Sequence, residues 1–375
     1  MKNTSKYKVD ISIVLCIVLF AFISIVTIGS AEKLLDESTN LVLKQIIWYV
    51  IGFIFVLFVM FIGNHLLYKN SWFLYAFGVL LLILVLFFGK EINHARCWFQ
   101  IKGIGTFQPS EFMKIILIIT LGKMIDKFKT KYNNPTLMEE FKFLLKVAIV
   151  VGIPSILTFL EPDTGVVLIY LLITIVMLFI AGIRYRWFGI LFGILLGFIG
   201  IVLITYFINN DLFISIFGSS FFLRVDRLLD WSSGIGYQLE NGITSIGSGG
   251  LLGYGINNTP IYFPEPQTDF IFAVFANNFG FFGSTTLLVL LTFFDLKLVK
   301  LAIESPNNTN KYVISGIIGM LIYQQLQNIG MTIGIMPITG ITLPFISYGG
   351  SSLISYMIML GIILNISNEN IRYRN

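Results

Sequence analysis

Charged side chains are scarce in this chain. Asp, Glu, Lys and Arg make up 12% of its 375 residues, whereas 56% are hydrophobic and the mean hydropathy is +0.85. Soluble globular domains carry about 25% charged residues, so this composition excludes a soluble globular protein. It indicates a polytopic membrane protein instead.

Cysteine and histidine are rarer still, with two residues of each. Cys16 lies in an apolar run and Cys97 in a polar interval, so the pair predicts no disulfide framework. His65 lies in a short interval that is typical of a solvated turn. We therefore assign no metal site from the sequence.

Ten apolar runs make up most of the chain. Most are about 18 to 25 residues long, enough to cross a hydrocarbon core of roughly 30 Å as a helix. Backbone groups inside lipid have no water to bond, so such runs must be α-helical. The sequence predicts a single all-α membrane domain over residues 1–375, with about ten transmembrane helices at 11–30, 43–63, 71–89, 110–125, 143–160, 165–183, 187–207, 269–294, 312–333 and 346–366.

Lysine and arginine are unevenly distributed around these runs. With the N-terminus inside, 17 of the 25 basic residues fall on the cytoplasmic side, as the positive-inside rule requires. Both termini are then cytoplasmic, and residues 208–268 form a large extracellular loop between the seventh and eighth spans. The net charge of +5 reflects this topology, so membrane lipids are expected partners and nucleic acid is not.

The first outer segment, residues 90–109, has more polar and charged side chains than a simple connector between two spans needs. Ser110 is expected to cap the helix that follows it, with Glu111 in the first turn. Positive charge is otherwise scarce on the outer side, yet three basic residues gather in and just after this segment: Arg96, Lys102 and Lys114.

Two further outer segments are equally polar. The two carboxylates of residues 161–165 either cap a turn or bind a metal, and the capped turn is the favoured interpretation. Residues 222–231, which include Arg224, have the pattern of an interfacial amphipathic helix. Residues 247–255 are glycine-rich but lack the Lys-Ser/Thr ending of a phosphate loop, although backbone N–H groups there could still face an anion. The long outer interval, residues 208–268, is followed by Asp269, on the border of an apolar helix.

The last three spans contain polar groups that need partners inside a bundle or a wet cavity. They include Asn277 and Asn278 in the eighth span and residues 323–328 in the ninth. Residues 336–352 then combine prolines and glycines in a way that predicts a re-entrant or broken helix near the outer interface.

At these residues the sequence resembles the RodA/FtsW/SpoVE family, the SEDS proteins of bacterial cell-wall synthesis. Residues 328–334 and the short tails are more similar to RodA than to FtsW. The resemblance implies a peptidoglycan glycosyltransferase of the bacterial cytoplasmic membrane. Such an enzyme polymerises lipid II on the outer face beside a class B penicillin-binding protein, in cell elongation or division. The segments that carry the resemblance are 107–114, 161–165, 247–255, 266–274 and 328–352.

The resemblance also implies residue roles. It makes Asp269 the catalytic base and Trp98 a residue that function requires. Two departures stand out, because His94 occupies the place of a usual glycine, and Asn277 and Asn278 replace a common pair of glutamates. The second departure argues against a role for carboxylates inside the eighth span.

The expected reaction is attack by a sugar 4-hydroxyl on an anomeric carbon that bears a lipid pyrophosphate, with inversion. One base suffices, and the charge of the leaving pyrophosphate must be met by cations or N–H groups. No cofactor is required by the sequence, and Mg²⁺ or Mn²⁺ stays open as another source of positive charge. The expected substrate-binding residues are Trp98, Arg96, Lys102, Glu111, Lys114, Arg224, Thr268, Gln267 and Ser347.

Two other functions stay open at this level. A lipid II flippase or transporter would suit broken helices and a polar ninth span. Ion-coupled carriers place an ionisable residue near the bilayer midplane, but none of the ten predicted spans has an Asp or Glu at its centre, which favours an enzyme. The third alternative is a non-catalytic scaffold for cell-wall machinery.

Overall fold

The computed structural model describes residues 7–35, 40–92, 95–101, 105–219, 221–222, 225 and 236–374, so Lys102, Arg224 and most of the expected helix at 222–231 lie outside the described residues. The ten predicted spans fall on ten helices, which confirms the all-α prediction. They are α1 (Ile11–Glu32), α2 (Leu41–Ile62), α4 (Ser71–Phe88), α5 (Pro109–Lys131), α6 (Leu137–Leu160), α7 (Thr164–Ile180), α8 (Tyr185–Ile208), α12 (Ile271–Glu304), α13 (Asn308–Thr332) and α14 (Gly350–Arg374).

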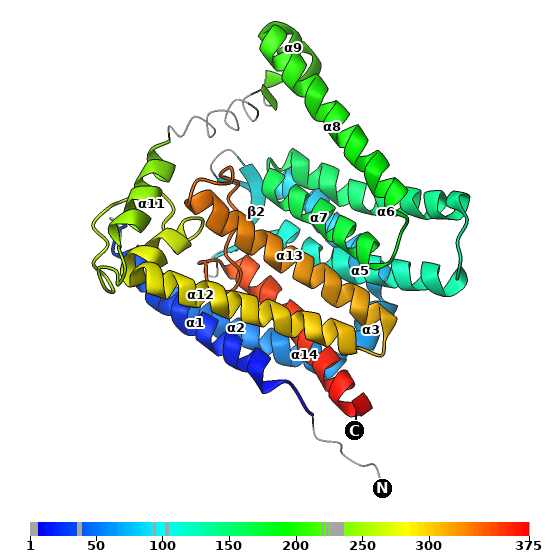
Figure 1. Cartoon of the computed structure of the whole chain (residues 1–375), viewed down its shortest axis with the longest axis horizontal. Helices are drawn as coiled ribbons and strands as arrows, with labels where there is room; N and C mark the ends of the chain where they lie inside the picture. The colour runs from blue at the N-terminus through cyan, green and yellow to red at the C-terminus, as the bar shows by residue number, and fades with distance from the viewer. Residues whose placement is uncertain are drawn as a thin grey trace.

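Most of these helices pack into one bundle, with α13 and α14 among its most buried elements (Figure 1). Six of the helices are long and apolar enough to cross a membrane by length and composition alone. In contrast, α8 projects from the bundle and is exposed along nearly its whole apolar length, ending in the short helix α9 (Asn210–Phe217). A helix that is apolar on every side and contacts little protein is suited to lipid.

The chain ends meet at one end of the bundle, where the backbone N–H of Lys8 donates to Asn368 Oδ1 at 3.0 Å and that of Asp10 to Ser367 Oγ at 2.9 Å. A short helix, α3 (Asn64–Lys69), takes the place of the solvated turn expected around His65.

A small antiparallel sheet that the sequence did not predict lies at the opposite end, in strand order β1 (Lys90–Ile92), β2 (Ala95–Ile101) and β3 (Gly105–Phe107). The sheet runs directly into α5. That helix begins at Pro109, with Gln108 as its N-cap residue, so the expectation that Ser110 is the cap was wrong by two positions. Proline favours this first helical position because the missing N–H would be unpaired there anyway.

The longest helix, α12, is broken at Gly280, whose φ of 64° lies in the left-handed region. The break frees backbone groups, and residues 247–255 bind them. Tyr254 N donates to Asn277 O at 3.0 Å, and Gly255 N donates to Asn278 O at 3.0 Å. From the far side of the break, Phe281 N donates to Gly250 O at 2.9 Å. The glycine-rich segment is therefore a backbone clamp on a discontinuous helix.

The two asparagines beside the break hold the same clamp through their side chains. Asn277 Nδ2 donates to Ser245 O at 2.8 Å, at the end of α11 (Tyr237–Ser248), and Asn278 Oδ1 accepts from Thr259 Oγ1 at 3.0 Å. Amides supply both donors and acceptors to these partners, which gives the departure from the family pattern a structural role.

The sequence placed no Asp or Glu at the centre of any span, but it did not anticipate Asp295. The eighth helix continues ten residues beyond the predicted end at 294, to Glu304, so Asp295 lies inside it. Its side chain is buried and accepts a hydrogen bond from Gln325 Nε2 of α13 at 3.3 Å. The distribution of carboxylates therefore no longer counts against a transporter.

Candidate active site

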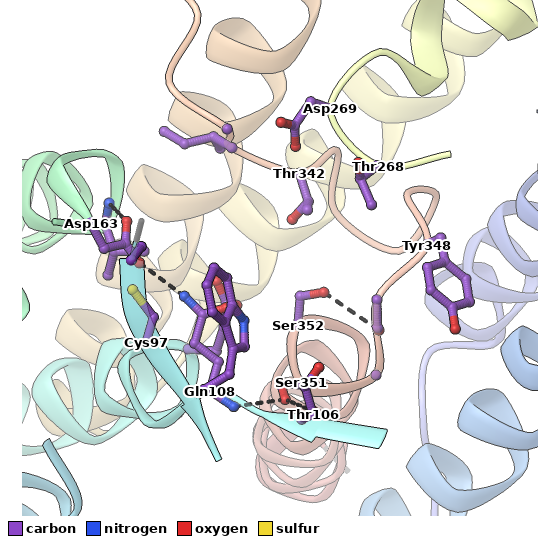
Figure 2. A pocket seen from close by; sticks show the side chains of 18 of the residues that line it. Cys97, Thr106, Gln108, Asp163, Thr268, Asp269, Thr342, Tyr348, Ser351 and Ser352 are labelled. Atoms are coloured by element: carbon purple, nitrogen blue, oxygen red, sulfur yellow. Dashed lines mark hydrogen bonds between the residues drawn. The ribbon is translucent and has the colours of Figure 1, made fainter. Parts of the chain in front are cut away.

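A cavity of about 630 Å³ lies where the sheet, the start of α5, the α6–α7 corner and the segment before α14 converge (Figure 2). The segment from 333 to 349 has no helix, and Leu343, Phe345 and Ile346 are buried in the bundle, which confirms the re-entrant prediction. The polar and aromatic lining residues are Lys44, Trp48, Trp98, Thr106, Gln108, Glu111, Asp163, Glu265, Thr268, Asp269, Gln324, Thr339, Thr342, Tyr348, Ser351 and Ser352.

Backbone contacts hold the turn that carries Asp269 against this re-entrant segment. Asn328 Nδ2 donates to Asp269 O at 2.9 Å, and Ser347 Oγ donates to Thr268 O at 2.7 Å. The N–H of Tyr348 donates to Gln267 O at 2.9 Å. The structure thus places Thr268 and Asp269 on the cavity wall, whereas Gln267 and Ser347 lie behind it and position the turn.

The carboxylate of Asp269 faces the cavity (Figure 2), and within the described residues it accepts no hydrogen bond. Burial, and next the negative charge of Glu265, raise its pKa to about 7. Both effects disfavour the ionised form. An unpaired carboxyl group with a pKa near neutrality is well matched to proton abstraction at physiological pH.

A hydrogen-bonded network forms the opposite wall. Trp98 Nε1 donates to Gln108 Oε1 at 3.1 Å, and Gln108 Nε2 donates to Asp163 Oδ2 at 2.9 Å. The backbone N–H of Gln108 donates to Ser351 Oγ at 3.0 Å, and that hydroxyl donates to Thr106 O at 3.0 Å. An aromatic ring beside fixed amide and hydroxyl groups is an arrangement that suits a sugar.

Asp163 combines two roles. It caps α7 by accepting from Val166 N at 3.1 Å, as the capped-turn interpretation expected, and it also lines the cavity. Burial is the largest effect on its carboxyl and raises the pKa to about 6, although the hydrogen bond from Val166 opposes the shift.

The predicted cations are placed unequally. Lys114 is fully buried beneath the cavity, where its Nζ lies 2.7 Å from Glu111 Oε2 and 5.3 Å from the centre of the Tyr356 ring. Arg96 is exposed on β2, outside the cavity lining, with Nε 3.3 Å from Glu91 Oε2. Trp98, Glu111, Thr268 and Asp269 are the predicted site residues that the structure brings together around the cavity. The substrate roles of all the expected residues stay predictions.

Sequence reasoning missed most of the other lining residues, among them Lys44, Trp48, Asp163 as a site residue, and Tyr348. Lys44 and Trp48 are spaced by one helical turn near the start of the second apolar run, a spacing that places both on one face. That spacing was the available signal, but only the tertiary structure shows which way the face points.

The described residues contain no group of three or more His, Cys, Asp or Glu side chains placed to hold a metal ion. Asp163 and Glu111 already have protein partners, since Asp163 accepts hydrogen bonds from Val166 and Gln108 and Glu111 pairs with Lys114. The involvement of Mg²⁺ or Mn²⁺ stays a prediction, and no reaction step below depends on it.

Glu161 lies behind the same wall and is fully buried, with neither carboxyl oxygen hydrogen-bonded to a described residue. Burial, and next the charge of Asp163, raise its pKa to about 9. The folded state therefore holds a proton that the unfolded chain releases near pH 4.5. By linkage, the protein loses stability as the pH rises from about 4.5 towards 9.

We expect Glu161→Gln to raise the melting temperature in detergent at pH 8 and to flatten its decline with pH. At pH 7 the carboxylate must take up a proton when the chain folds, which costs ~3 kcal/mol, and the amide removes this cost. Thermal unfolding of both proteins between pH 5 and 9 measures this effect. Parallel curves for the two proteins would contradict the protonated state of Glu161.

Together, the bundle and the site define a polytopic membrane protein with a polar cavity at one end and an unpaired carboxylate on its wall. The chain belongs to the FtsW/RodA/SpoVE family of cell cycle proteins, whose family model matches residues 7–372.

Curated relatives and solved structures agree with this membership. The chain is 35% identical over 277 residues to stage V sporulation protein E of Bacillus subtilis, covering 71% of this chain and 70% of that protein. It is 33% identical to the peptidoglycan glycosyltransferase MrdB of Helicobacter pylori, covering 92% and 88%. The crystal structure of Thermus thermophilus RodA matches with a TM-score of 0.71 at 28% identity, over 98% and 99% of the two chains. A chain of a peptidoglycan synthase complex, studied for its coordination of polymerization and crosslinking, matches with a TM-score of 0.78 at 28% identity, over 96% and 98%.

Proposed function

We propose that this protein is a peptidoglycan glycosyltransferase that polymerises lipid II in cell elongation or division. The observation that carries the proposal is the unpaired Asp269 carboxylate on the wall of a cavity large enough for a sugar. Relatives that bear this activity in their names, MrdB among them, support the assignment.

In the proposed reaction Asp269 accepts the proton of the sugar 4-hydroxyl as that oxygen attacks the anomeric carbon of the lipid-linked donor. The bond from that carbon to the pyrophosphate oxygen breaks, and lipid pyrophosphate leaves with the electron pair. Attack from the opposite side inverts the α-linkage to a β-linkage. Trp98, Glu111 and Thr268 bind the sugars, and Gln267 and Ser347 position the turn that carries the base. Arg96, Lys102 and Arg224 remain proposed phosphate partners.

The site faces the outside of the bacterial cytoplasmic membrane in this proposal, and both termini are cytoplasmic. The termini lie together at the end of the bundle away from the sheet, which supports one side for both of them (Figure 1). The proposed partner is a class B penicillin-binding protein, in keeping with the synthase complex among the solved structures.

A lipid II flippase is the second candidate, and Asp295 is the observation that favours it. This buried carboxylate and Gln325 form a polar pair between two membrane helices, the kind of group on which ion-coupled carriers depend.

Reconstitution separates the two functions. The purified protein, its transpeptidase partner and lipid II are combined in vesicles, and glycan chains are resolved by gel electrophoresis. The proposal expects chains several disaccharides long. Movement of lipid II across the vesicle membrane without any polymer would support the flippase and refute the glycosyltransferase.

A further inference from the structure

The charges around the cavity are strongly one-sided. Four carboxylic acids line it: Glu111, Asp163, Glu265 and Asp269. Among the described lining residues, Lys44 is the only basic one. A dianionic lipid pyrophosphate entering such a cavity needs a cation, and the leaving pyrophosphate needs one more strongly as its charge grows.

Lys44 is free to supply that charge. Its side chain is exposed, and no described carboxylate lies within ion-pair distance of it. The other described candidates are engaged elsewhere, because Lys114 is neutralised by Glu111 and Arg96 pairs with Glu91 outside the lining. A lysine ammonium is a compact point charge on a flexible stem, a common form of phosphate contact.

The structure fixes the face of α2 on which Lys44 lies. The adjacent Gln45 is fully buried, and its Nε2 donates to Ser24 Oγ at 3.1 Å and to Ser347 O at 3.3 Å. These bonds tie α2 to the re-entrant segment and so set its rotation. One turn further, Trp48 lies under Gly350, where an added Cβ would come within 2.7 Å of the indole ring.

The outer end of α2 also separates two environments. Next to Lys44, the side chains of Leu43 and Ile47 are exposed on the apolar surface of the bundle. An exposed apolar surface on a membrane helix faces lipid tails. A lipid whose tail lies along this face would bring its headgroup to Lys44 at the cavity entrance.

We propose that Lys44 binds the pyrophosphate of the lipid-linked donor and of the released product, and that the lipid tail lies along the outer face of α2. This inference rests on the proposed glycosyltransferase function, which it makes specific. The base and the phosphate-binding group then come from different elements, Asp269 from the turn before α12 and Lys44 from α2.

The test uses the full-length protein in nanodiscs with two lipid probes, undecaprenyl pyrophosphate and uncharged undecaprenol, measured by direct binding. Lys44→Gln removes the charge, Lys44→Arg restores it, and Lys33→Gln is the matched control at an exposed lysine outside the cavity lining. We expect wild type, Lys44→Arg and Lys33→Gln to prefer the pyrophosphate at least about tenfold, and Lys44→Gln to lose that preference, because a hydrogen bond to a charged group is worth about tenfold or more.

Steady-state polymerisation of lipid II gives the second readout, with kcat/KM lowered in Lys44→Gln alone. Full retention of the pyrophosphate preference by Lys44→Gln would overturn the assignment of Lys44 whether or not the protein polymerises lipid II. If Lys44→Gln loses the preference but the wild-type protein makes no polymer, the proposed glycosyltransferase is refuted and Lys44 remains a binding site for pyrophosphate lipids.

Discussion

Asp269→Asn is expected to lower the rate of glycan polymerisation at least about a hundredfold, because it removes the group that accepts the hydroxyl proton. The carboxylate accepts no hydrogen bond from a described residue, so the neutral amide disturbs no packing or pairing. Reconstitution with lipid II and the transpeptidase partner measures the rate, and size-exclusion chromatography checks the fold. Equal chain formation by both proteins would remove Asp269 from the chemistry.

The pH dependence sharpens this expectation. With its pKa raised to about 7, Asp269 is protonated and inactive as a base below that pH, so kcat/KM falls about tenfold per unit on the acid side. Folding linkage runs the same way as for Glu161: stability declines as the pH rises from about 3.8 through 7. Asp269→Asn should therefore unfold at a temperature no lower than wild type at pH 8.

Glu265→Gln provides the matched control for that profile. Its charge helps to keep the pKa of Asp269 high, so its removal should move the acid limb to lower pH without abolishing activity. An unchanged limb would mean that the activity reports another titrating group.

Gly253→Ala is expected to cause the largest loss of stability, enough to prevent accumulation of folded protein. The residue has a φ of +79°, and an added Cβ would lie 2.2 Å from the carbonyl oxygen of Asn278. That oxygen belongs to the backbone of the broken helix, so it cannot move aside without opening the clamp. The strained backbone alone costs on the order of 1–3 kcal/mol.

Gly247→Ala is the control for this substitution. It lies in α11, six residues away, where no atom lies within 4 Å of an added Cβ. Alanine also favours a helix over glycine by roughly 1 kcal/mol, so this variant should be as stable as wild type or more so. Detergent-solubilised yield and melting temperature measure both variants; similar values would show that the clamp does not support α12.

The sequence predicted the helical architecture well because lipid leaves the backbone few choices. Each apolar run of membrane length had to become a helix, and the prolines and glycines of residues 336–352 predicted an irregular segment. The sheet at 90–107 was missed, since its three short strands pair only with each other and carry little periodic signal. Asp295 was misplaced because the apolar run ended at 294 while the helix did not.

The site was predicted in part, for a related reason. Asp269 and Trp98 stood out through their chemistry and through a family resemblance, and both lie on the cavity wall. Arg96 and Lys114 were grouped because they are near one another in the sequence, yet one is exposed on β2 and the other is buried beneath the cavity. Lys44 is far from both in the sequence and reaches the cavity from another helix.

The sequence by itself determined that this protein spans a membrane and where its ten long helices lie, and it singled out Asp269 as the candidate base. These properties depend on local composition, which hydrophobicity and charge express directly. The tertiary structure decided which charges share one cavity, how a broken helix is held together by a distant glycine segment, and which lysine is free. Those outcomes depend on the rotation and packing of helices far apart in the chain, and long-range contacts leave no local pattern from which to read them.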